Sequence, residues 1–394
     1  MFYIGIDIAK HNHEAALLDE RGVVLTKPFS FSNSSSGCEK VLTAMVKHDI
    51  SKHNVIIGME ATGHYWLSVY SFFTDLGFDV KVVNPIQSES FRRINIRKVK
   101  NDSVDSICIA DLMRFGKFSN CSVPDESIVA LKNLSRYRFA LVDSCSDLKR
   151  RAITILDQIF PEYASLFSDT FGITSKELLL KFTIPEEFVA ISTAKLANFI
   201  TKASNGRLGR TKAEEIKAAA ETSFGIKYAL SSFSFQLRQI IDQIAFIESQ
   251  VEELEKKLAI LLKESGMDIL TTIIGFGAVT ASAVAGEIAD ISKFTSAPQL
   301  VAYAGLDASV KQSGQFEGTK NSISKRGSPH LRRVLWQTAM IASFRDPALS
   351  LYYQSLMARG KHHKTAVTAV ARKLCNIIWS VLNSGEPYSP HLKN

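Results

Sequence analysis

The sequence predicts an α/β N-terminal domain, a helical middle with a coiled coil, and a mainly α C-terminal domain with a helix-hairpin-helix-like motif. Three observations predict this class. Short β-branched runs alternate with helical patterns in the first third, an apolar repeat fills residues 236–265, and two glycines interrupt an apolar stretch near residue 275. Because 394 residues exceed what one core holds, we expect domains at residues 1–122, 123–265 and 266–394.

The first third alternates between strand and helix signals. The runs "FYIGIDIA", "HEAALLDE" and "VVLTKPFSF" predict three successive strands. A serine-capped helix follows at "SSSGCEKVLTAMVKH", then the strand "NVIIGME", the helix "HYWLSVYSFFTDLG", the strand "FDVKVVNP" and a helical region to about residue 118. This order is that of an RNase H-like domain, in which the first and fourth strands are neighbours.

The middle of the chain is mostly helical in pattern. Residues 125–235 show no chemistry that we recognise, so we expect scaffold there. The coiled coil follows, and its partner is either a second subunit or another helix of this chain. We favour a homodimer, or a tetramer built from it, because two-fold symmetry is common among oligomers. The 3-4 spacing is carried by Leu237, Ile240, Ile244, Ile247, Val251, Leu254, Leu258 and Leu261.

The C-terminal part contains "IIGFGAVTASAVAGEI", in which two apolar helical segments flank a tight glycine turn. This pattern is similar to a helix-hairpin-helix, whose turn amides contact a DNA phosphate. Plain packing of small-residue helices is the alternative. A polar loop rich in glycine and serine comes next, and it leads to a helix that opens with Arg332 and Arg333.

The charge of the chain indicates an acidic partner. The net charge is +8, and residues 318–394 hold twelve Lys or Arg against two acids. The stretch "FRRINIRKVK" adds five cations without an acid. Such localised charge favours nucleic-acid phosphates over a basic surface that only aids solubility. The predicted phosphate ligands are Arg92, Arg93, Arg97, Lys98, Lys100, Lys320, Lys325, Arg326, Arg332 and Arg333.

Cysteine usage and hydropathy predict a cytoplasmic protein. Five cysteines occur without a CxxC pair, which argues for a reducing compartment and against a zinc module. The N-terminus "MFYIGIDIAK" does not have the pattern of a signal peptide. The most apolar window contains three glycines and Glu287, so we expect buried helices and no membrane span.

Two aspartates close the basic stretch, in "KNDSVDS". Asp102 and Asp105 are three residues apart and share a helix face. Two carboxylates 4 Å apart repel by about 4 kcal/mol at an effective dielectric of 20. A divalent cation removes that repulsion, and full solvation of a helix start is the alternative.

Two further acids favour a metal site over a solvated helix start. Asp7 interrupts an apolar strand, and Glu60 ends the buried fourth strand. Since these strands are neighbours in an RNase H-like sheet, a helix beside them can add Asp102 and Asp105. Four carboxylates suit two Mg²⁺ (or Mn²⁺) ions, which activate a nucleophile and stabilise the leaving oxygen of a phosphodiester.

The chain resembles one insertion-sequence transposase family with a RuvC-like DEDD domain. The resemblance is carried by "GIDIAK", "GMEATGHYW", "KVVNP" and "KVKNDSVDSICIADLMRFG" at one end. It continues with "IIGFGAVTASAVAGEIADISKFTSAPQLVAYAGL", "KQSG" and "ISKRGSPHLRRVLWQTA" at the other. In the hairpin turn the family usually has proline, at the position that we assign to Gly275.

The resemblance implies a site-specific DNA recombinase that moves its own element. It implies a noncoding bridge RNA that pairs with both element and target DNA. The catalytic acids fall on Asp7, Glu60, Asp102 and Asp105, and the nucleophilic serine of the second domain falls on Ser313. We therefore expect a cytoplasmic, nucleoid-associated protein.

Other functions stay open at this point. A hydrolytic RuvC-like junction endonuclease would use the same acids without Ser313. A catalytically silent nucleic-acid-binding protein would have lost the site, against which the four intact acids argue. A sugar-kinase-like protein shares the strand order but needs a glycine-rich nucleotide loop, which we do not find.

Overall fold

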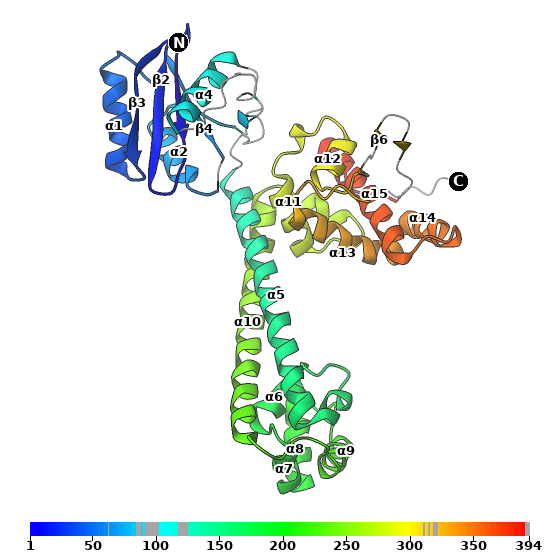
Figure 1. The fold of residues 1–394 in the computed structure, drawn as a ribbon. Coiled ribbons are helices and arrows are strands. Elements are labelled where there is room, and N and C mark those ends of the chain that lie inside the picture. Colours follow the sequence, from blue (N-terminus) through cyan, green and yellow to red (C-terminus); the bar gives the residue numbers. More distant parts are fainter. Residues whose placement is uncertain are drawn as a thin grey trace. The chain divides into compact units, whose positions relative to one another are not determined.

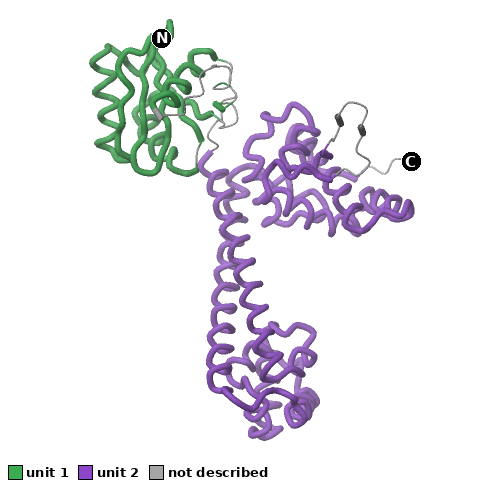
Figure 2. Tube along the Cα trace, viewed as in Figure 1, with its two compact units in different colours: residues 1–123 green, residues 124–394 purple. Residues whose placement is uncertain are grey.

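The computed structural model describes residues 1–61, 63–83, 88–89, 91, 102–116, 125–309, 312–313, 316–317 and 322–390. The chain divides into two compact units, Met1–Val123 and Pro124–Asn394 (Figure 2). The first unit is α/β and the second is helical apart from one small hairpin. This confirms the predicted α/β N-terminal part and the helical remainder.

The first unit is built on a five-stranded mixed sheet (Figure 1). The order of the strands is β3-β2-β1-β4-β5, with β2 antiparallel to β1 and β3, and with β4 parallel to β1 and β5. The prediction that the first and fourth strands are neighbours is confirmed. The elements are β1 (Phe2–Asp7), β2 (Asn12–Leu18), β3 (Val24–Ser32), α1 (Ser35–Val46), β4 (Val55–Glu60), α2 (Trp66–Asp75), β5 (Asp79–Val83) and α4 (Asp102–Phe115).

The two faces of this sheet are covered differently. Because side chains alternate along a strand, Ile4 and Ile6 of β1 point to one face, with Ile57 and Met59 of β4. These residues form the main core of the unit together with α1 and α2. The opposite face receives α4, which buries Ala110 against β2.

The second unit contains a pair of long helices, α5 (Glu126–Ile159) and α10 (Leu230–Glu264), which run side by side (Figure 1). Residues 160–229 connect them and pack at one end of the pair around Tyr163 and Phe188. We call residues 160–229 the helical tip. It consists of η1 (Pro161–Leu166), α6 (Ile173–Lys181), α7 (Pro185–Ala190), α8 (Thr193–Ala203) and α9 (Arg210–Glu221).

The apolar repeat of residues 236–265 packs within the chain. Leu237, Ile244 and Leu258 are buried against α5 and the cores at its two ends. Ion pairs cross the same contact, from Arg138 to Glu255 at 2.6 Å and from Lys149 to Glu248 at 2.8 Å. The stripe therefore packs on the other long helix of the same chain, the second of the two partners considered, and the expectation that it also joins two subunits stays a prediction.

The C-terminal core lies at the other end of the helix pair. Its central helix, α11, is buried along its last eight residues, and Gly286 of α11 packs against α5. A Cβ at Gly286 would lie 2.5 Å from the backbone nitrogen of Lys132, so only glycine allows this close approach of the two helices. The elements are η2 (Asp268–Thr272), α11 (Ala278–Ile288), η3 (Ile291–Lys293), α12 (Ala297–Tyr303), β6 (Gln312–Ser313), β7 (Phe316–Glu317), α13 (Pro329–Arg345), α14 (Pro347–Ala358) and α15 (His363–Ser384).

One helix of the described part, α15, is long and apolar enough to cross a membrane by length and composition. Core helices share those properties. Val370, Leu374 and Ile378 of α15 are fully buried in the C-terminal core. The apolar window around residue 280 forms α11, also buried in that core, as predicted.

Candidate functional site

Two acids lie at one end of the sheet, on the face that α4 covers, and a third lies near the start of α4. Ile6 pairs with Met59, so Asp7 and Glu60 are the next residues of two adjacent parallel strands. Both are half-buried and lie on the face opposite the main core, since Ile6 and Met59 belong to that core. Asp105, in the first turn and a half of α4, is buried. The side chain of Asp102, the first residue of α4, lies outside the described residues.

Two glycines bring α4 close to the sheet. Gly5 of β1 and Gly58 of β4 are paired in register, two positions before Asp7 and Glu60. A Cβ at Gly5 would lie 2.0 Å from the Ser106 carbonyl oxygen and 2.4 Å from the Ala110 nitrogen. A Cβ at Gly58 would lie 2.4 Å from the Met113 Cγ. Because glycine has no Cβ, these two positions let α4 approach the sheet closely, and this approach sets the position of Asp105.

A fourth acid, Glu14, was not predicted from the sequence. Glu14 pairs in register with Asp7 across β1 and β2, and it lies on the same face as Ala16, which contacts α4. The Ser103 hydroxyl of α4 donates a hydrogen bond to Glu14 Oε1 at 2.8 Å. The alternation of β2 could have found Glu14, had the face toward α4 been known.

Hydroxyl groups hold two of these carboxylates. Besides the bond from Ser103 to Glu14, the Ser88 hydroxyl donates to Glu60 Oε2 at 2.7 Å. Among the described side chains, no three His, Cys, Asp or Glu lie close enough together to hold a metal ion. The donor set is nevertheless all oxygen, which suits Mg²⁺ or Mn²⁺, and the Asp102 side chain would add to it.

The predicted nucleophile, Ser313, lies in the second unit. It ends β6, which pairs antiparallel with β7 so that Ser313 is opposite Phe316. The side chain of Ser313 lies outside the described residues. At the base of the hairpin, Ala308 bridges to Ile323, and the Ser309 nitrogen donates to the Ser322 oxygen at 2.8 Å. Ser313 thus belongs to a two-stranded ribbon.

Two of the predicted phosphate ligands are exposed next to this hairpin. Lys325 and Arg326 follow its second strand and are open to solvent. Lys325 has φ +56°, and its nitrogen donates to the Gly305 oxygen at 3.1 Å, which fixes the turn after α12. Six other predicted ligands lie outside the described residues: Arg92, Arg93, Arg97, Lys98, Lys100 and Lys320.

Arg332 and Arg333 make contacts within the chain. Arg332 Nη1 donates to the Ala304 carbonyl at 3.2 Å. Arg333 forms two hydrogen bonds of 2.7 Å with the Asp143 carboxylate, and its guanidinium lies 4.8 Å from the centre of the Phe139 ring. The bond to Asp143 raises the pKa of Arg333. These arginines join α13 to α12 and α5, so their role as phosphate ligands stays a prediction.

A buried carboxylate anchors the start of α13. Glu287 is 3% exposed, accepts hydrogen bonds from Arg136 Nε at 2.6 Å and Nη2 at 3.1 Å, and accepts a third from the Ser328 hydroxyl at 2.8 Å. Burial would raise the pKa of Glu287, but the bonds from Arg136 and Ser328 and nearby positive charge outweigh it and lower the pKa. Ser328 is the N-cap of α13, so Glu287 ties that helix to α11 and α5.

The glycine turn before α11 is flanked by η2 and α11, so a 3₁₀-helix stands where the first helix of the hairpin was expected. Gly275 has φ +95°, whereas proline is fixed near −65°. A proline could not adopt the backbone angle that Gly275 has here, and the assignment of the family's proline to this position stays a prediction. The dense burial of α11 shows that packing against α5 and α13 is one role of this segment.

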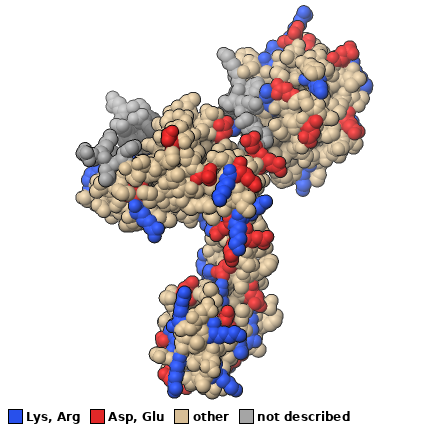
Figure 3. Space-filling model, turned by 180° about the vertical axis from the view of Figure 1, so that it is seen from behind, with Lys and Arg blue, Asp and Glu red and all other residues tan. Residues whose placement is uncertain are grey.

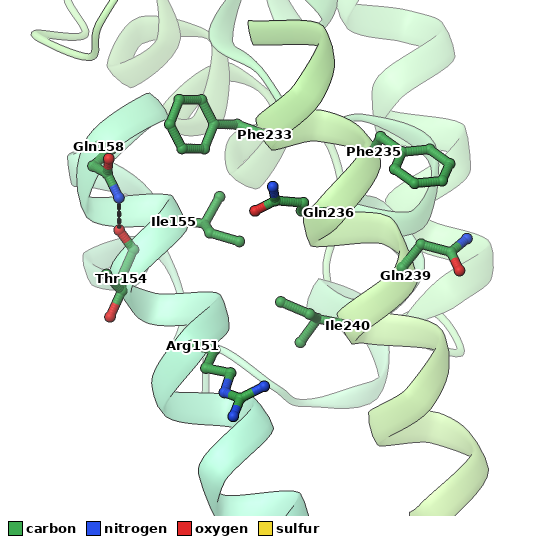
Figure 4. Close-up of a pocket in the computed structure, with 9 residues that line it drawn as sticks. All are labelled: Arg151, Thr154, Ile155, Gln158, Phe233, Phe235, Gln236, Gln239 and Ile240. Atoms are coloured by element: carbon green, nitrogen blue, oxygen red, sulfur yellow. Dashed lines mark hydrogen bonds between the residues drawn. The ribbon is translucent and has the colours of Figure 1, made fainter. Parts of the chain in front are cut away.

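A groove of about 500 Å³ lies between α5 and α10 near the helical tip (Figure 4). Its lining has no carboxylate, thiol or hydroxyl cluster suited to catalysis. It consists of four apolar residues, three glutamines, one arginine and one threonine: Arg151, Thr154, Ile155, Gln158, Phe233, Phe235, Gln236, Gln239 and Ile240. The four cysteines in the described part, Cys38, Cys108, Cys145 and Cys375, are all buried.

Comparisons with known proteins match both ends of the chain. A family model of the DEDD domain of IS110 elements, described as Transposase, matches residues 4–161. A second, described as Transposase IS116/IS110/IS902 family, matches residues 267–354. The first contains all four predicted acids, and the second contains the predicted serine.

Similar proteins extend over the whole chain. The pilin gene-inverting protein of Moraxella bovis is 24% identical over 99% of this chain and 98% of its own. The mini-circle putative transposase for IS117 of Streptomyces coelicolor is 22% identical over 92% of this chain and 89% of its own. The transposase for insertion sequence element IS1328 of Yersinia enterocolitica is 30% identical over 39% of this chain and 47% of its own. The chain belongs to the IS110 family of transposases, and it is a DNA recombinase.

Proposed function

We propose that this chain cuts and rejoins DNA strands of a mobile element through Ser313, assisted by divalent metal at four acids. The observation that carries the proposal is the placement of Asp7, Glu60 and Asp105 at one end of adjacent elements, on one face of the sheet. A RuvC-like domain at residues 1–122 would hold these acids. Residues 123–265 would link it to a serine-bearing transposase domain at residues 266–394.

Asp7, Glu60, Asp102 and Asp105 are the residues that would hold Mg²⁺ or Mn²⁺. Bound there, the metal would supply Lewis acidity toward the phosphodiester and lower the pKa of a hydroxyl. Glu14 lies beside Asp7 in the sheet, and the Ser103 bond holds it. We expect Glu14 to orient α4 and to add negative charge at the site.

Ser313 would act as the nucleophile. Its hydroxyl oxygen attacks a DNA phosphorus, the bond from phosphorus to the leaving strand oxygen breaks, and the serine proton ends on that oxygen. The covalent phosphoserine conserves the energy of the broken bond. A hydroxyl from another strand then attacks the same phosphorus, breaks its bond to Ser313 and restores the serine. Lys325 and Arg326 are placed beside the hairpin to bind flanking phosphates.

The resemblance extends the proposal to a guide. We propose that a noncoding bridge RNA pairs with element and target DNA, and that at least two subunits assemble for strand exchange, as a dimer or tetramer. The resemblance alone supports the RNA. The protein would then act in the cytoplasm, at the nucleoid.

Junction sequencing tests the proposal. The chain is expressed with its native flanking DNA together with donor and target plasmids. Wild type is compared with Ser313→Ala, Asp102→Asn and the matched control Ser322→Ala, which removes an exposed hydroxyl at the base of the same hairpin. We expect precise junctions from wild type and the control, and none from the other two variants.

The failure modes separate the alternatives. Junctions that persist in Ser313→Ala would refute the serine role. Free DNA ends from that variant would favour a hydrolytic junction endonuclease. Junctions that persist in Asp102→Asn would refute the metal site, and binding of Tb³⁺ by wild type, lost in Asp102→Asn, checks the site without any turnover.

A further inference from the structure

The helical tip carries an unusually one-sided run of charge. Residues 188–213 contain no Asp or Glu but include five cations, among them Lys195, Lys202 and Arg207. Hydroxyl and amide side chains are interspersed among them. The composition is that of a phosphate-binding segment. The rest of the tip is rich in acids, so this run is a local feature.

The fold leaves these three cations exposed to solvent. Helix α8 buries Leu196 and Ile200 in the tip core, which leaves Lys195 and Lys202 on the exposed side. The loop after α8 is fixed, because the Ser204 hydroxyl accepts a bond from the Leu208 nitrogen at 2.9 Å and Gly206 adopts φ +82°. Arg207, between them, is exposed on that fixed loop.

A fourth cation comes from the neighbouring helix. Lys181 ends α6 and is exposed, and its ammonium lies 4.9 Å from the centre of the Phe199 ring of α8. Phe199 is one helical turn from both Lys195 and Lys202. We call Lys181, Lys195, Lys202 and Arg207 the α8 basic surface.

Most other cations of this region pair with acids, and Lys217 donates to the backbone carbonyls of Val189 and Ile191. Ion pairs with carboxylates engage Lys176, Arg210, Lys212, Lys227 and Arg238. No carboxylate in the described part of the chain pairs with a member of the α8 basic surface. Figure 3 shows Lys and Arg side chains along the tip, with acidic side chains between some of them. The contrast indicates that these four charges face a ligand outside the chain.

The spacing of the charges fits a polymer. Lys195 and Lys202 are seven residues apart, which is about 10 Å along the helix. One strand of a DNA duplex presents a phosphate about every 3.4 Å of axis, so phosphates about three steps apart along the strand can meet both lysines. A single small anion could not reach both ends of this row.

We propose that the α8 basic surface binds the phosphate backbone of duplex DNA without reading its sequence. This contact is separate from Ser313 and from the acids, and it rests on the proposed function only in taking DNA as the substrate. The tip then is a second DNA-binding element of the recombinase. The expectation of a purely structural role for residues 125–235 would be replaced.

The test measures how salt weakens DNA binding. Full-length protein is titrated onto a 40-base-pair random duplex in EDTA, by fluorescence anisotropy, across a series of salt concentrations. Lys195→Gln, Lys202→Gln and Arg207→Gln are combined in one variant. The matched control combines Lys212→Gln, Lys227→Gln and Lys256→Gln, which removes the same charge from cations that are paired with acids.

We expect the log–log salt slope of the first variant to fall by about 2 to 3 relative to wild type, at about 0.9 for each lost phosphate contact. A slope equal to that of the control overturns the proposal, and so does a loss confined to an RNA duplex of the same sequence. Lysine acetylation of wild type gives an answer that needs no variant. DNA should protect Lys195 and Lys202 but not Lys227, and equal labelling with and without DNA also overturns it.

Failure of this inference is distinguishable from failure of the proposed function. Binding is measured in EDTA and does not require strand cleavage. If wild type makes no junctions but the slope falls, the serine chemistry fails and the α8 basic surface stands. If wild type makes junctions but the salt slope of the triple variant matches the control, the serine chemistry stands and the α8 basic surface is not a DNA contact.

Discussion

Substituting Gly5→Ala should damage the fold and the acid site together. The added methyl would lie 2.0 Å from the Ser106 oxygen and 2.4 Å from the Ala110 nitrogen, and both are backbone atoms of α4. Backbone cannot rotate away as a side chain can. The helix must therefore move away from β1, by more than 1 Å, to restore ordinary contact.

The size of the effect follows from that movement. Overpacking in a filled core costs about 1–3 kcal/mol, and a clash with backbone belongs at the upper end. Asp105 precedes Ser106 and moves with it, away from Asp7 and Glu60. A displacement of about 1 Å in a catalytic group can cost about 100-fold in rate. Gly5→Ala should thus lose about 3 kcal/mol of stability and most of its DNA cleavage.

Gly58→Ala is the matched control for this prediction. Its methyl would meet the Met113 side chain, which can change rotamer, so we expect a loss of about 1 kcal/mol and a smaller loss of activity. Urea denaturation gives the free energy of unfolding of each variant, and plasmid cleavage gives the rate. If Gly5→Ala is as stable and active as Gly58→Ala, the close approach of α4 does not position Asp105, and our reasoning fails.

Three further predictions concern the second unit. Glu287→Gln should cost about 2 kcal/mol in urea denaturation at pH 7. The pKa of Glu287 lies below its ordinary 4.5, so the stabilisation is present above pH 4.5 and is lost as pH falls through the folded pKa. The difference in unfolding free energy between wild type and Glu287→Gln should therefore shrink below pH 4.5. A difference independent of pH would contradict this reasoning. Arg333→Ala should lower the free energy of unfolding by up to about 1 kcal/mol and leave the salt slope of DNA binding unchanged. Arg326→Ala should lower the salt slope by about 0.9 and leave stability unchanged. The opposite result would make Arg333 the phosphate ligand. Ile244→Glu should destabilise the long helices by more than about 3 kcal/mol without changing the mass measured by light scattering. The control Phe246→Glu, at an exposed position, should cost less than about 0.5 kcal/mol. A drop in mass for Ile244→Glu would mean that Ile244 joins subunits.

The N-terminal elements could be predicted because local patterns decide them. Apolar alternation and turn residues mark each strand, and strand order then places Asp7 beside Glu60. Glu14 was missed because alternation shows that a side chain faces one side of a sheet but not which side an incoming helix covers. That information lies in Gly5 and Gly58, whose role is visible only once α4 is in place.

The pairing of the long helices shows another limit of sequence patterns. The apolar repeat of α10 is visible, but a repeat has the same form whether a second subunit or another helix covers it. The matching stripe of α5 is interrupted by Arg138 and Lys149, which pair with Glu255 and Glu248 of α10. Contacts such as Arg333 with Asp143 join residues 190 positions apart, and no local pattern reports them.

These charged positions in the helix pair have a consequence for DNA binding. Sliding α10 along α5 would separate Arg138 from Glu255 and Lys149 from Glu248, and partly buried charges would lose their partners. Because these pairs are partly exposed, they add a modest preference for one register to that of the buried apolar contacts. That register fixes the distance along the pair between the C-terminal core, which carries Ser313, and the helical tip. A DNA contact on the tip would therefore lie at a set distance from the serine hairpin, as a recombinase that must cut at one phosphate requires.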